Sequence, residues 1–426
     1  MQAALATAPG KPLASKAVYF PGLNALRYIA AASVVFCHIE EVKLHYHLPN
    51  YYHFFLFHGV GTLAVSFFFV LSGFLITYLL LKEKEARQDI NVRSFYIRRA
   101  LRIWPVYYLV SLLGLFVLPH IPALAFPAES AKVVSQYPFN ALLYSLFMPN
   151  VALWLNFFVP YASQLWSVGV EEQFYLFWPW LFKLLKKPLA AMVGLVVLFT
   201  VLRLGFHFSG LYLLGGTPQK LVVALYNFLN YTRIDCMAVG GIGGYLIYSE
   251  SEWFRRYCLN RPVEIGALGG MLAFFVLTST FVKYDISFIE SPVYSVFFLL
   301  ILVNVACSER SLLRLEGRGW TFLGNISYSI YMYQYLAIGA VLLLFRSTQQ
   351  RSFSPVYNTL FHVACQCAVV GLAYVSYHYF EIPFLKLKNK YALVKSTTEP
   401  TPTQQAAGSQ PIHLPAAGVA IPSTAA

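Results

Sequence analysis

Charged residues are scarce in this sequence. Only 12% of the 426 residues are Asp, Glu, Lys or Arg, whereas a soluble globular domain carries roughly 25%. Hydrophobic residues make up 58%, and the mean hydropathy is +0.58. A chain of this length with so little charge cannot cover its surface with groups that favour water. The composition therefore excludes a soluble globular protein and indicates an integral membrane protein.

Cysteines and short catalytic motifs are also few or absent. The six cysteines lie in or beside apolar runs, and their spacing indicates neither a disulfide framework nor a zinc site. The patterns HExxH, GxxxxGK[ST] and GxSxG do not occur. Residues 1–22 lack a basic start followed by an apolar core and a cleavage site, so we expect no cleaved signal peptide. We therefore predict no metal site and no permanently bound cofactor.

Ten apolar runs approach the length that crosses a bilayer, roughly 17 to 25 residues. The fourth contains Pro179, and glycines between positions 240 and 244 interrupt the sixth. A further apolar stretch, 139–158, is broken by Pro149 and two asparagines, and we expect a re-entrant or interfacial segment there. The sequence thus predicts an all-α polytopic integral membrane protein with about ten transmembrane helices. The predicted spans are 22–40, 57–81, 101–119, 170–185, 188–208, 221–249, 262–282, 287–308, 322–345 and 356–384.

Basic residues predict the orientation of these spans. With both termini in the cytoplasm, 22 of the 31 Lys and Arg residues fall on the cytoplasmic side, and six fall outside. This asymmetry is typical of membrane proteins, so it explains the net charge of +13 better than nucleic-acid binding does. We predict a multi-pass protein of the cytoplasmic (inner) membrane. Residues 1–18 would be a cytoplasmic segment, 19–390 the membrane domain, and 391–426 a disordered cytoplasmic tail.

The first predicted span contains an arginine and a histidine. Arg27 and His38 are eleven helical steps apart, so they lie within about 20° of the same face and roughly 16 Å apart along it. Glu41 comes one turn after His38 and can orient its imidazole. His38 suits a general base. A structural alternative is that Arg27 reaches lipid phosphates while His38 lies at a wet helix end.

Three arginines precede the third span. Arg98 and Arg102 are four residues apart on a helix, with Arg99 beside them. Planar guanidinium groups bind phosphates well, so this cluster suits a phosphate-bearing ligand such as coenzyme A. Ordinary anchoring at the cytoplasmic surface, or binding of anionic lipids, is the alternative.

Two further clusters carry ionisable groups. Trp166 and Ser167 precede a carboxylate pair that includes Glu171, and this side chain could position sugar hydroxyls or carry a proton. The alternative is a helix N-terminus with Ser167 as its cap and the acids near it. Arg233 and Asp235 lie inside the sixth predicted span, where they neutralise each other or groups of neighbouring helices.

In order along the chain, these segments resemble the acyltransferase family 3, membrane proteins that acylate extracytoplasmic glycans and other hydroxyl compounds. The similarity extends from about residue 19 to residue 385. It rests on Arg27-x10-His38, Phe68-Phe69-Val70-Leu71-Ser72-Gly73-Phe74, Arg99…Arg102-Ile103-x-Pro105-x-Tyr107, Trp166-Ser167-x-x-x-Glu171-x-x-Phe174-Tyr175, Arg233-x-Asp235…Gly240, Ser327-Tyr328-Ser329-Ile330-Tyr331 and Phe380-Glu381-x-Pro383.

Two features depart from the family pattern. Gln334 stands where the family commonly has histidine, so we leave it out of the predicted catalytic set. Some members carry a C-terminal esterase-like domain, whereas here only a short polar tail follows the last span. We therefore expect the membrane domain to complete the transfer itself or to pass the acyl group to a partner.

The resemblance implies transfer of an acyl group, most commonly acetyl, from acyl-CoA as co-substrate to a hydroxyl of a cell-envelope or exported polysaccharide or glycolipid. We expect His38 to act as general base or to carry a transient acyl group, and Glu171 to orient the acceptor or move a proton. Arg27, Arg98, Arg99 and Arg102 would bind the donor, while Glu41, Trp166, Ser167, Arg233 and Asp235 would be substrate-binding or structural. Expected partners are a carbohydrate or glycolipid acceptor, membrane lipid and proteins of a polysaccharide assembly pathway, and no nucleic acid. A glycan transporter or flippase is the alternative, because intramembrane charges and glycine-broken spans also suit transport.

Overall fold

The computed structural model describes residues 17–126, 129–155, 157, 159–209, 220–280, 286–345, 354–391 and 395–396. This part of the chain is helical apart from one short parallel pairing of β1 (Ala17–Val18) with β2 (Lys395–Ser396). The all-α prediction is therefore confirmed. Most of the predicted cytoplasmic segment 1–18 and of the predicted tail 391–426 lies outside the described residues.

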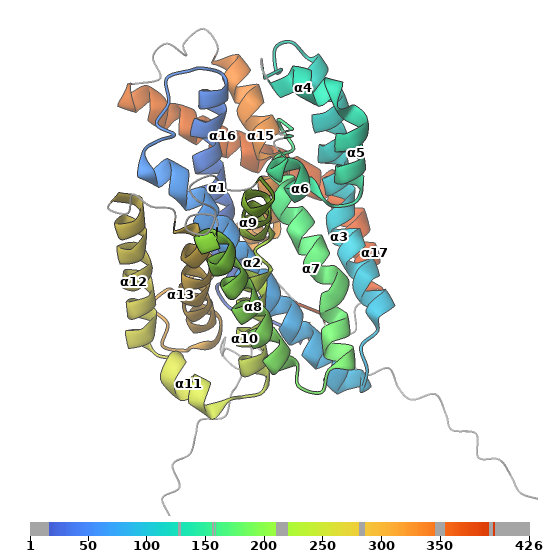
Figure 1. The fold of residues 1–426 in the computed structure, drawn as a ribbon, viewed down its shortest axis with the longest axis vertical. Helices are drawn as coiled ribbons and strands as arrows, with labels where there is room; N and C mark the ends of the chain where they lie inside the picture. The colour runs from blue at the N-terminus through green and yellow to red at the C-terminus, as the bar shows by residue number, and fades with distance from the viewer. Residues whose placement is uncertain are drawn as a thin grey trace, which may run out of the picture.

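Four helices form the centre of the bundle: α1 (Leu23–His45), α2 (Phe55–Arg87), α10 (Ile234–Tyr248) and α15 (Ser327–Leu344) (Figure 1). Helices α2 and α10 pack backbone to backbone. A Cβ atom on Gly73 would lie 1.9 Å from the Met237 carbonyl oxygen, and one on Gly240 would lie 1.9 Å from the Val70 carbonyl oxygen. Only glycine permits this approach, as small-residue contacts do between other membrane helices. The glycines therefore join two helices.

The predicted interruption of the sixth span at its glycines is wrong. The break falls at Arg233, which separates α9 (Lys220–Thr232) from α10, and α10 then continues through all four glycines. Helix interiors tolerate glycine where tight packing against a neighbour compensates for its flexibility. The ninth predicted span, 322–345, is also divided, into α14 (Arg318–Asn325) and α15.

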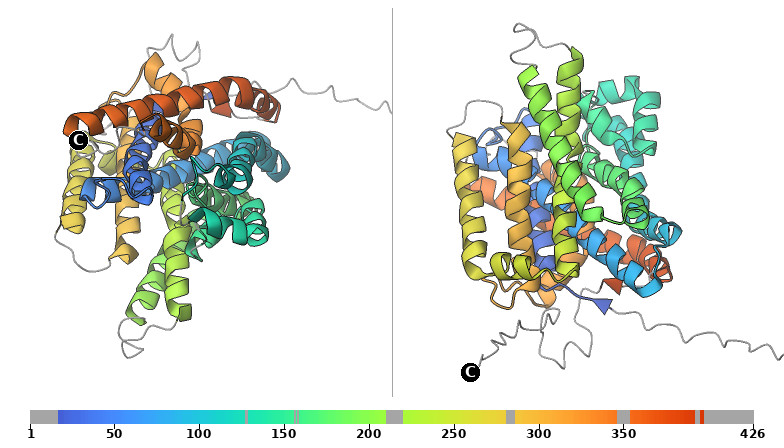
Figure 2. Two further views of the ribbon diagram at one scale, coloured as in Figure 1. Left: turned by 90° about the horizontal axis from the view of Figure 1, so that it is seen from above. Right: turned by 60° about the horizontal axis from the view of Figure 1, so that its bottom comes forward.

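The remaining elements surround this centre. The predicted re-entrant stretch forms two short helices, α5 (Tyr137–Ser145) and α6 (Pro149–Trp154). At 1.5 Å per residue neither is long enough to cross a bilayer. Helix α16 (Pro355–Ser376) continues through η5 (Tyr377–Glu381) into α17 (Ile382–Asn389), and this long segment runs obliquely along one side of the bundle (Figure 2). The others are α3 (Val92–Leu112), η1 (Leu113–Val117), η2 (Leu118–His120), α4 (Glu129–Ser135), α7 (Leu165–Leu184), α8 (Pro188–Phe208), α11 (Glu252–Cys258), α12 (Arg261–Thr280) and α13 (Ser287–Cys307).

Among the described residues, seven helical segments are long and apolar enough to cross a membrane. The predicted count of about ten is not confirmed. Helices α1 and α7 are long enough but carry polar and ionisable residues, and α10 has only 15 residues. The seven segments are α2, α3 with η1 and η2, α8, α12, α13, α15, and α16 with η5 and α17.

The two described chain ends meet at one end of the bundle. The pairing of β1 with β2 lies at the same end as α11, as the right-hand view of Figure 2 shows. That both termini lie on one side of the membrane stays a prediction. Which side that is remains a prediction from the distribution of basic residues.

Candidate functional site

His38 lies near the C-terminal end of α1 and faces α15. Its Nδ1 atom is 2.9 Å from Oε1 of Gln334, and its Nε2 atom is 3.5 Å from Oε2 of Glu41. The imidazole stacks on Tyr335 with ring centroids 4.7 Å apart, and the Tyr335 hydroxyl donates to Glu41 over 2.9 Å. The sequence placed Glu41 beside His38, and the structure brings the two together. An imidazole held on three sides has a fixed orientation.

Gln334 decides which nitrogen of His38 carries the proton. Its Nε2 atom donates to the Tyr331 carbonyl oxygen over 2.8 Å, which fixes the amide so that Oε1 faces the imidazole. An amide oxygen only accepts, so Nδ1 of His38 must be the protonated nitrogen. In the neutral ring the lone pair then lies on Nε2, beside Glu41. This residue was left out of the predicted catalytic set, and the structure shows that it contacts His38 directly.

A cavity of about 130 Å³ lies in the centre of the bundle, between α1, α2, α3, α7 and α15. Arg27, Arg99, Arg102, Ser167 and Glu171 all line it. Tyr331 of α15 lines the cavity as well, and Gln334 is one turn further along the same helix, about 4.5 Å by helical rise. Gln334, which contacts His38, is therefore one helical turn beyond a lining residue of the cavity, while His38 itself does not line it.

Two arginines lining this cavity have unused hydrogen-bond donors. Neither Arg99 nor Arg102 makes a hydrogen bond or ion pair with any described residue, and Nε of Arg99 is buried without a partner. Arg99 instead lies over the rings of Phe95 and Tyr175, 5.7 Å from each centroid. A buried guanidinium without a partner is costly, so it favours an anionic ligand.

Arg98 is used differently from its neighbours. Its guanidinium forms an ion pair with Glu83 over 2.7 Å and donates to the Tyr391 carbonyl oxygen over 2.9 Å. It is not among the residues that line the cavity. Arg98 therefore does not line the cavity together with Arg102, and its role in binding the donor stays a prediction. Arg98 holds α2, α3 and the end of α17 together, and the cavity pair is Arg99 with Arg102.

Glu171 and Ser167 face the cavity from α7 and are tied to its walls. The Tyr175 hydroxyl donates to Glu171 over 2.7 Å and is 2.5 Å from Oγ of Ser72. Ser167 is 2.6 Å from the Tyr331 hydroxyl. Because α7 begins at Leu165, Ser167 is inside the helix, and its interpretation as an N-cap is wrong.

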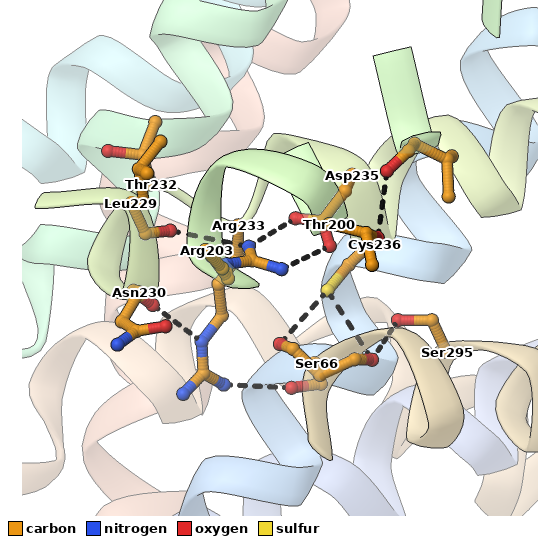
Figure 3. A network of polar contacts seen from close by, with 12 residues as sticks. Ser66, Thr200, Arg203, Leu229, Asn230, Thr232, Arg233, Asp235, Cys236 and Ser295 are labelled. Carbon is orange, nitrogen blue, oxygen red and sulfur yellow. Dashed lines mark hydrogen bonds and ion pairs between the residues drawn. The ribbon is translucent and has the colours of Figure 1, made fainter. Parts of the chain in front are cut away.

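Asp235 does not pair with Arg233. Both of its oxygens bind Arg203 of α8, over 2.6 and 2.7 Å, in a fully buried bidentate ion pair (Figure 3). Of the two alternatives left open by the sequence, neutralisation by a neighbouring helix is therefore confirmed for Asp235. Arg233 instead donates to the Asn230 carbonyl oxygen and to Oγ of Ser66, 3.1 and 2.8 Å away.

A second buried ionic cluster was missed in the sequence. Glu40, next to Glu41, accepts from Lys43 over 2.8 Å and is 2.8 Å from Nε2 of His362. The backbone N–H of Tyr51 also donates to Glu40. Three charged residues within four positions near a helix end are typical of the membrane–water interface, so nothing in the sequence indicated a buried cluster. The fold alone brings His362 of α16 to them. This cluster ties α1 to α16 behind the His38 site.

Lys388 was also missed as a neighbour of the cavity. It lies on α17 within electrostatic range of Arg102, Arg99 and Arg27. From the sequence alone, Lys388 was assigned only to the basic residues on the cytoplasmic side. With it, four basic residues gather near the cavity that Glu171 also lines, an arrangement that favours an anionic ligand.

The comparisons with known proteins agree with this geometry. A family model described as "Acyltransferase domain" matches residues 20–378. The chain therefore belongs to the acyltransferase family 3, as the resemblance in its motifs predicted, and it carries a membrane acyltransferase domain.

Named relatives are similar over most of this chain. It is 25% identical to "Putative O-acetyltransferase SACOL0978" of Staphylococcus aureus (strain COL) over 387 residues, and 26% identical to "Putative peptidoglycan O-acetyltransferase YrhL" of Bacillus subtilis (strain 168) over 385. It is also 25% identical to "O-acetyltransferase OatA" of Staphylococcus aureus over 379 residues. Each match covers 86% of this chain but only 58%, 55% and 57% of the respective relative. No solved structure matches the chain.

Proposed function

We propose that this chain transfers an acyl group, in the simplest case acetyl, from acyl-CoA to a hydroxyl of a glycan on the other side of the membrane. The main support for the proposal is the relative position of two sites, the arginine-lined cavity and His38. Arg99 and Arg102 present unused donors in a central cavity, and His38 lies beyond that cavity along α1 and α15. Family membership and the names of the relatives support O-acyl transfer.

The arginine end of the cavity would bind the donor. Guanidinium groups bind phosphates with short charge-assisted hydrogen bonds, and the coenzyme A moiety carries several phosphate charges. A volume of about 130 Å³ is below the range of roughly 300–1,000 Å³ typical of ligand sites, so the cavity would hold only part of the donor. Arg27 would line the path of the acyl-bearing arm, which spans about 16 Å from Arg27 to His38.

The histidine end would perform the chemistry. Nε2 of His38 takes the proton of the acceptor hydroxyl, and the oxygen attacks the thioester carbonyl carbon. The carbon–sulfur bond then breaks, and the departing thiolate receives the proton from His38. Glu41 stabilises the imidazolium from 3.5 Å, and Gln334 keeps Nδ1 protonated throughout. Glu171, held by Tyr175, would position a hydroxyl or relay a proton.

The acceptor is proposed as a polymer or lipid-linked glycan of the cell envelope. Two of the similar proteins are named as O-acetyltransferases without a stated acceptor, and YrhL is named for peptidoglycan. These relatives extend well beyond the matched region, so complete transfer by this chain alone is part of the proposal. The basic end of the bundle would face the cytoplasmic pool of acyl-CoA.

The test follows the coenzyme A thiol. The purified protein in nanodiscs receives acetyl-CoA with candidate glycans, and free thiol is measured for wild type, His38→Ala and a matched control, His378→Ala. His378 is an exposed histidine of η5 whose Nδ1 atom is close only to the Tyr374 carbonyl oxygen. We expect thiol release that requires a glycan and His38 but not His378. Equal release by the His38→Ala variant would refute the proposal, and glycan movement across vesicles without any thiol release would favour the transporter.

A further inference from the structure

A second and larger cavity lies on the other side of α2. Its volume is about 380 Å³, within the range of roughly 300–1,000 Å³ typical of small-molecule sites. It is bounded by the start of α2, the junction of α9 with α10, the end of α12 and the start of α13. In Figure 1 these segments lie away from α11, towards the opposite end of the bundle. On the predicted orientation, this cavity is reached from outside the cell.

Arg233 is the cation of this cavity. Its Nε and Nη1 atoms donate to neutral oxygens of Asn230, Thr62 and Ser66. The carboxylate two residues further on is occupied by Arg203, as Figure 3 shows. Nη2 of Arg233 therefore keeps both of its N–H groups without a partner among the described residues. A guanidinium held by neutral groups has donor capacity left for a ligand.

The other lining groups complement this donor. Glu290 supplies acceptor oxygens and a charge opposite to that of Arg233, so the two lining charges cancel. Thr278 and Tyr294 contribute hydroxyls that lie 3.3 Å apart and keep acceptor capacity, although Thr278 also donates to the Phe275 carbonyl oxygen. Phe275 contributes an aromatic ring. A sugar ring presents the same mixture, because its hydroxyls donate and accept while its C–H faces pack on aromatic rings. A cavity without net charge favours an uncharged ligand over an anion.

We propose that the cavity around Arg233 is a subsite that binds an uncharged sugar unit of the acceptor glycan; this inference rests on the proposed function. Nη2 of Arg233 donates to one sugar hydroxyl, Glu290 accepts from another, and Phe275 packs against the ring. The subsite is separate from the arginine pair that would bind the donor.

Trp166 connects the two cavities. The Arg233 guanidinium lies over its ring at 5.9 Å, and the ring packs edge to face on Phe69, which lines the central cavity. Tyr231 packs on the same indole with centroids 5.8 Å apart. Trp166 lines neither cavity, but it contacts Arg233 of the sugar subsite and Phe69 of the central cavity.

Tyr52 extends this contact towards the catalytic histidine. It lies in the loop between α1 and α2, where burial first, and then the charges of Glu41, Cys37 and Tyr231, raise its pKa to about 12. Tyr52 is thus within electrostatic range of Glu41, which contacts His38, and of Tyr231, which contacts Trp166.

Direct binding without any acyl donor tests this proposal. The probes are two uncharged oligosaccharides, chitotriose and maltotriose, and one acidic oligosaccharide, trigalacturonate, titrated by calorimetry into the full-length protein in nanodiscs. Ser279→Trp fills the cavity from an exposed position of α12, so folding is preserved, and Thr280→Trp is the matched control, because Thr280 is exposed and does not line the cavity. Arg233→Gln removes the charge while keeping an amide donor.

We expect at least one uncharged probe to bind more tightly than trigalacturonate. Ser279→Trp and Arg233→Gln should each weaken that binding by about tenfold or more, which is the effect of one lost charge-assisted hydrogen bond. Thr280→Trp should leave it unchanged. Tighter binding of the acid, no binding of either uncharged probe, or an unchanged affinity in Ser279→Trp would overturn the proposal.

The outcomes also separate this proposal from the proposed function. Thiol release that needs His38 but shows the same KM for glycan in Ser279→Trp would leave the transferase standing and reject the subsite. Binding that Ser279→Trp abolishes, in a protein that releases no thiol from acetyl-CoA, would keep the subsite and reject the transferase.

Discussion

The contact of Gln334 with His38 gives the sharpest prediction. Gln334 is fully buried and is the only acceptor that Nδ1 of the imidazole has within the described part of the chain. Gln334→Leu has nearly the same volume but cannot accept, so the Nδ1 proton loses its partner and the ring can present N–H at Nε2 instead. A base whose lone pair points away from the acceptor cannot take its proton.

The size of the effect follows from the lost hydrogen bond. Leaving a buried donor without a partner costs about 1–3 kcal/mol. If that cost falls on the transition state, kcat decreases by roughly 5- to 160-fold, because each 1.36 kcal/mol is a factor of ten. The KM for acetyl-CoA should stay the same, since Gln334 does not line the arginine cavity.

Gln334→Glu keeps a hydrogen-bond acceptor beside Nδ1 of His38 and adds a negative charge. The carboxylate can still accept from Nδ1, so it should retain more activity than the leucine variant. An added negative charge beside the ring favours its protonated form. The base is then deprotonated only at higher pH, and the acidic limb of the pH–rate profile moves upward.

The assay is thiol release from acetyl-CoA with saturating glycan, measured as kcat and KM over a range of pH. Gln366→Leu is the matched control, because Gln366 donates to the Ala32 carbonyl oxygen and so ties α16 to α1 without contacting His38. If Gln334→Leu keeps kcat within about twofold while His38→Ala abolishes turnover, the tautomer argument is wrong.

Three other predictions concern the donor, the buried ion pair and the helix contact. Substituting Arg99 and Arg102 with Gln should raise the KM for acetyl-CoA by about tenfold or more for each lost charge-assisted contact, measured by thiol release. Arg203→Leu should lower the thermal stability in detergent, since leaving Asp235 buried and unpaired costs about 3–5 kcal/mol, and the double variant Arg203→Leu/Asp235→Leu should recover most of it. Gly240→Ala should lower stability by about 1–3 kcal/mol or more, because its Cβ would meet a backbone oxygen of α2.

Each of these predictions has a control and a contrary result. Arg98→Gln should reduce stability through its lost pair with Glu83 while leaving the KM for acetyl-CoA unchanged, and equal KM effects at Arg98 and Arg99 would contradict the assignment. A double Arg203/Asp235 variant as unstable as the single one would show that the pair is not the cause. Gly269→Ala, on α12 with open space around it, should have no effect, and a loss equal to that of Gly240→Ala would exclude a packing origin.

Several features of this protein could be predicted from the sequence alone. The low charge and long apolar runs set the all-α membrane class, since backbone groups in lipid must satisfy one another within helices. Helical periodicity placed Arg27 and His38 on one face and Glu41 next to His38. The order of the motifs predicted the family, which the family model confirmed over residues 20–378. These features depend only on composition and on residues that are close in sequence, so no knowledge of helix packing is needed to predict them.

Contacts between helices were decided only by the tertiary structure. Asp235 pairs with Arg203, 32 residues away, in preference to Arg233 two positions away, because α8 packs against α10. Gln334 reaches His38 across 296 residues, and its role depends on where α15 lies rather than on its own residue type. Arg98 and Arg99 are neighbours in sequence but point to different partners, since successive residues of a helix differ by about 100° in direction. The sequence determined which side chains were available within the membrane domain; the packing of its helices decided which of them meet.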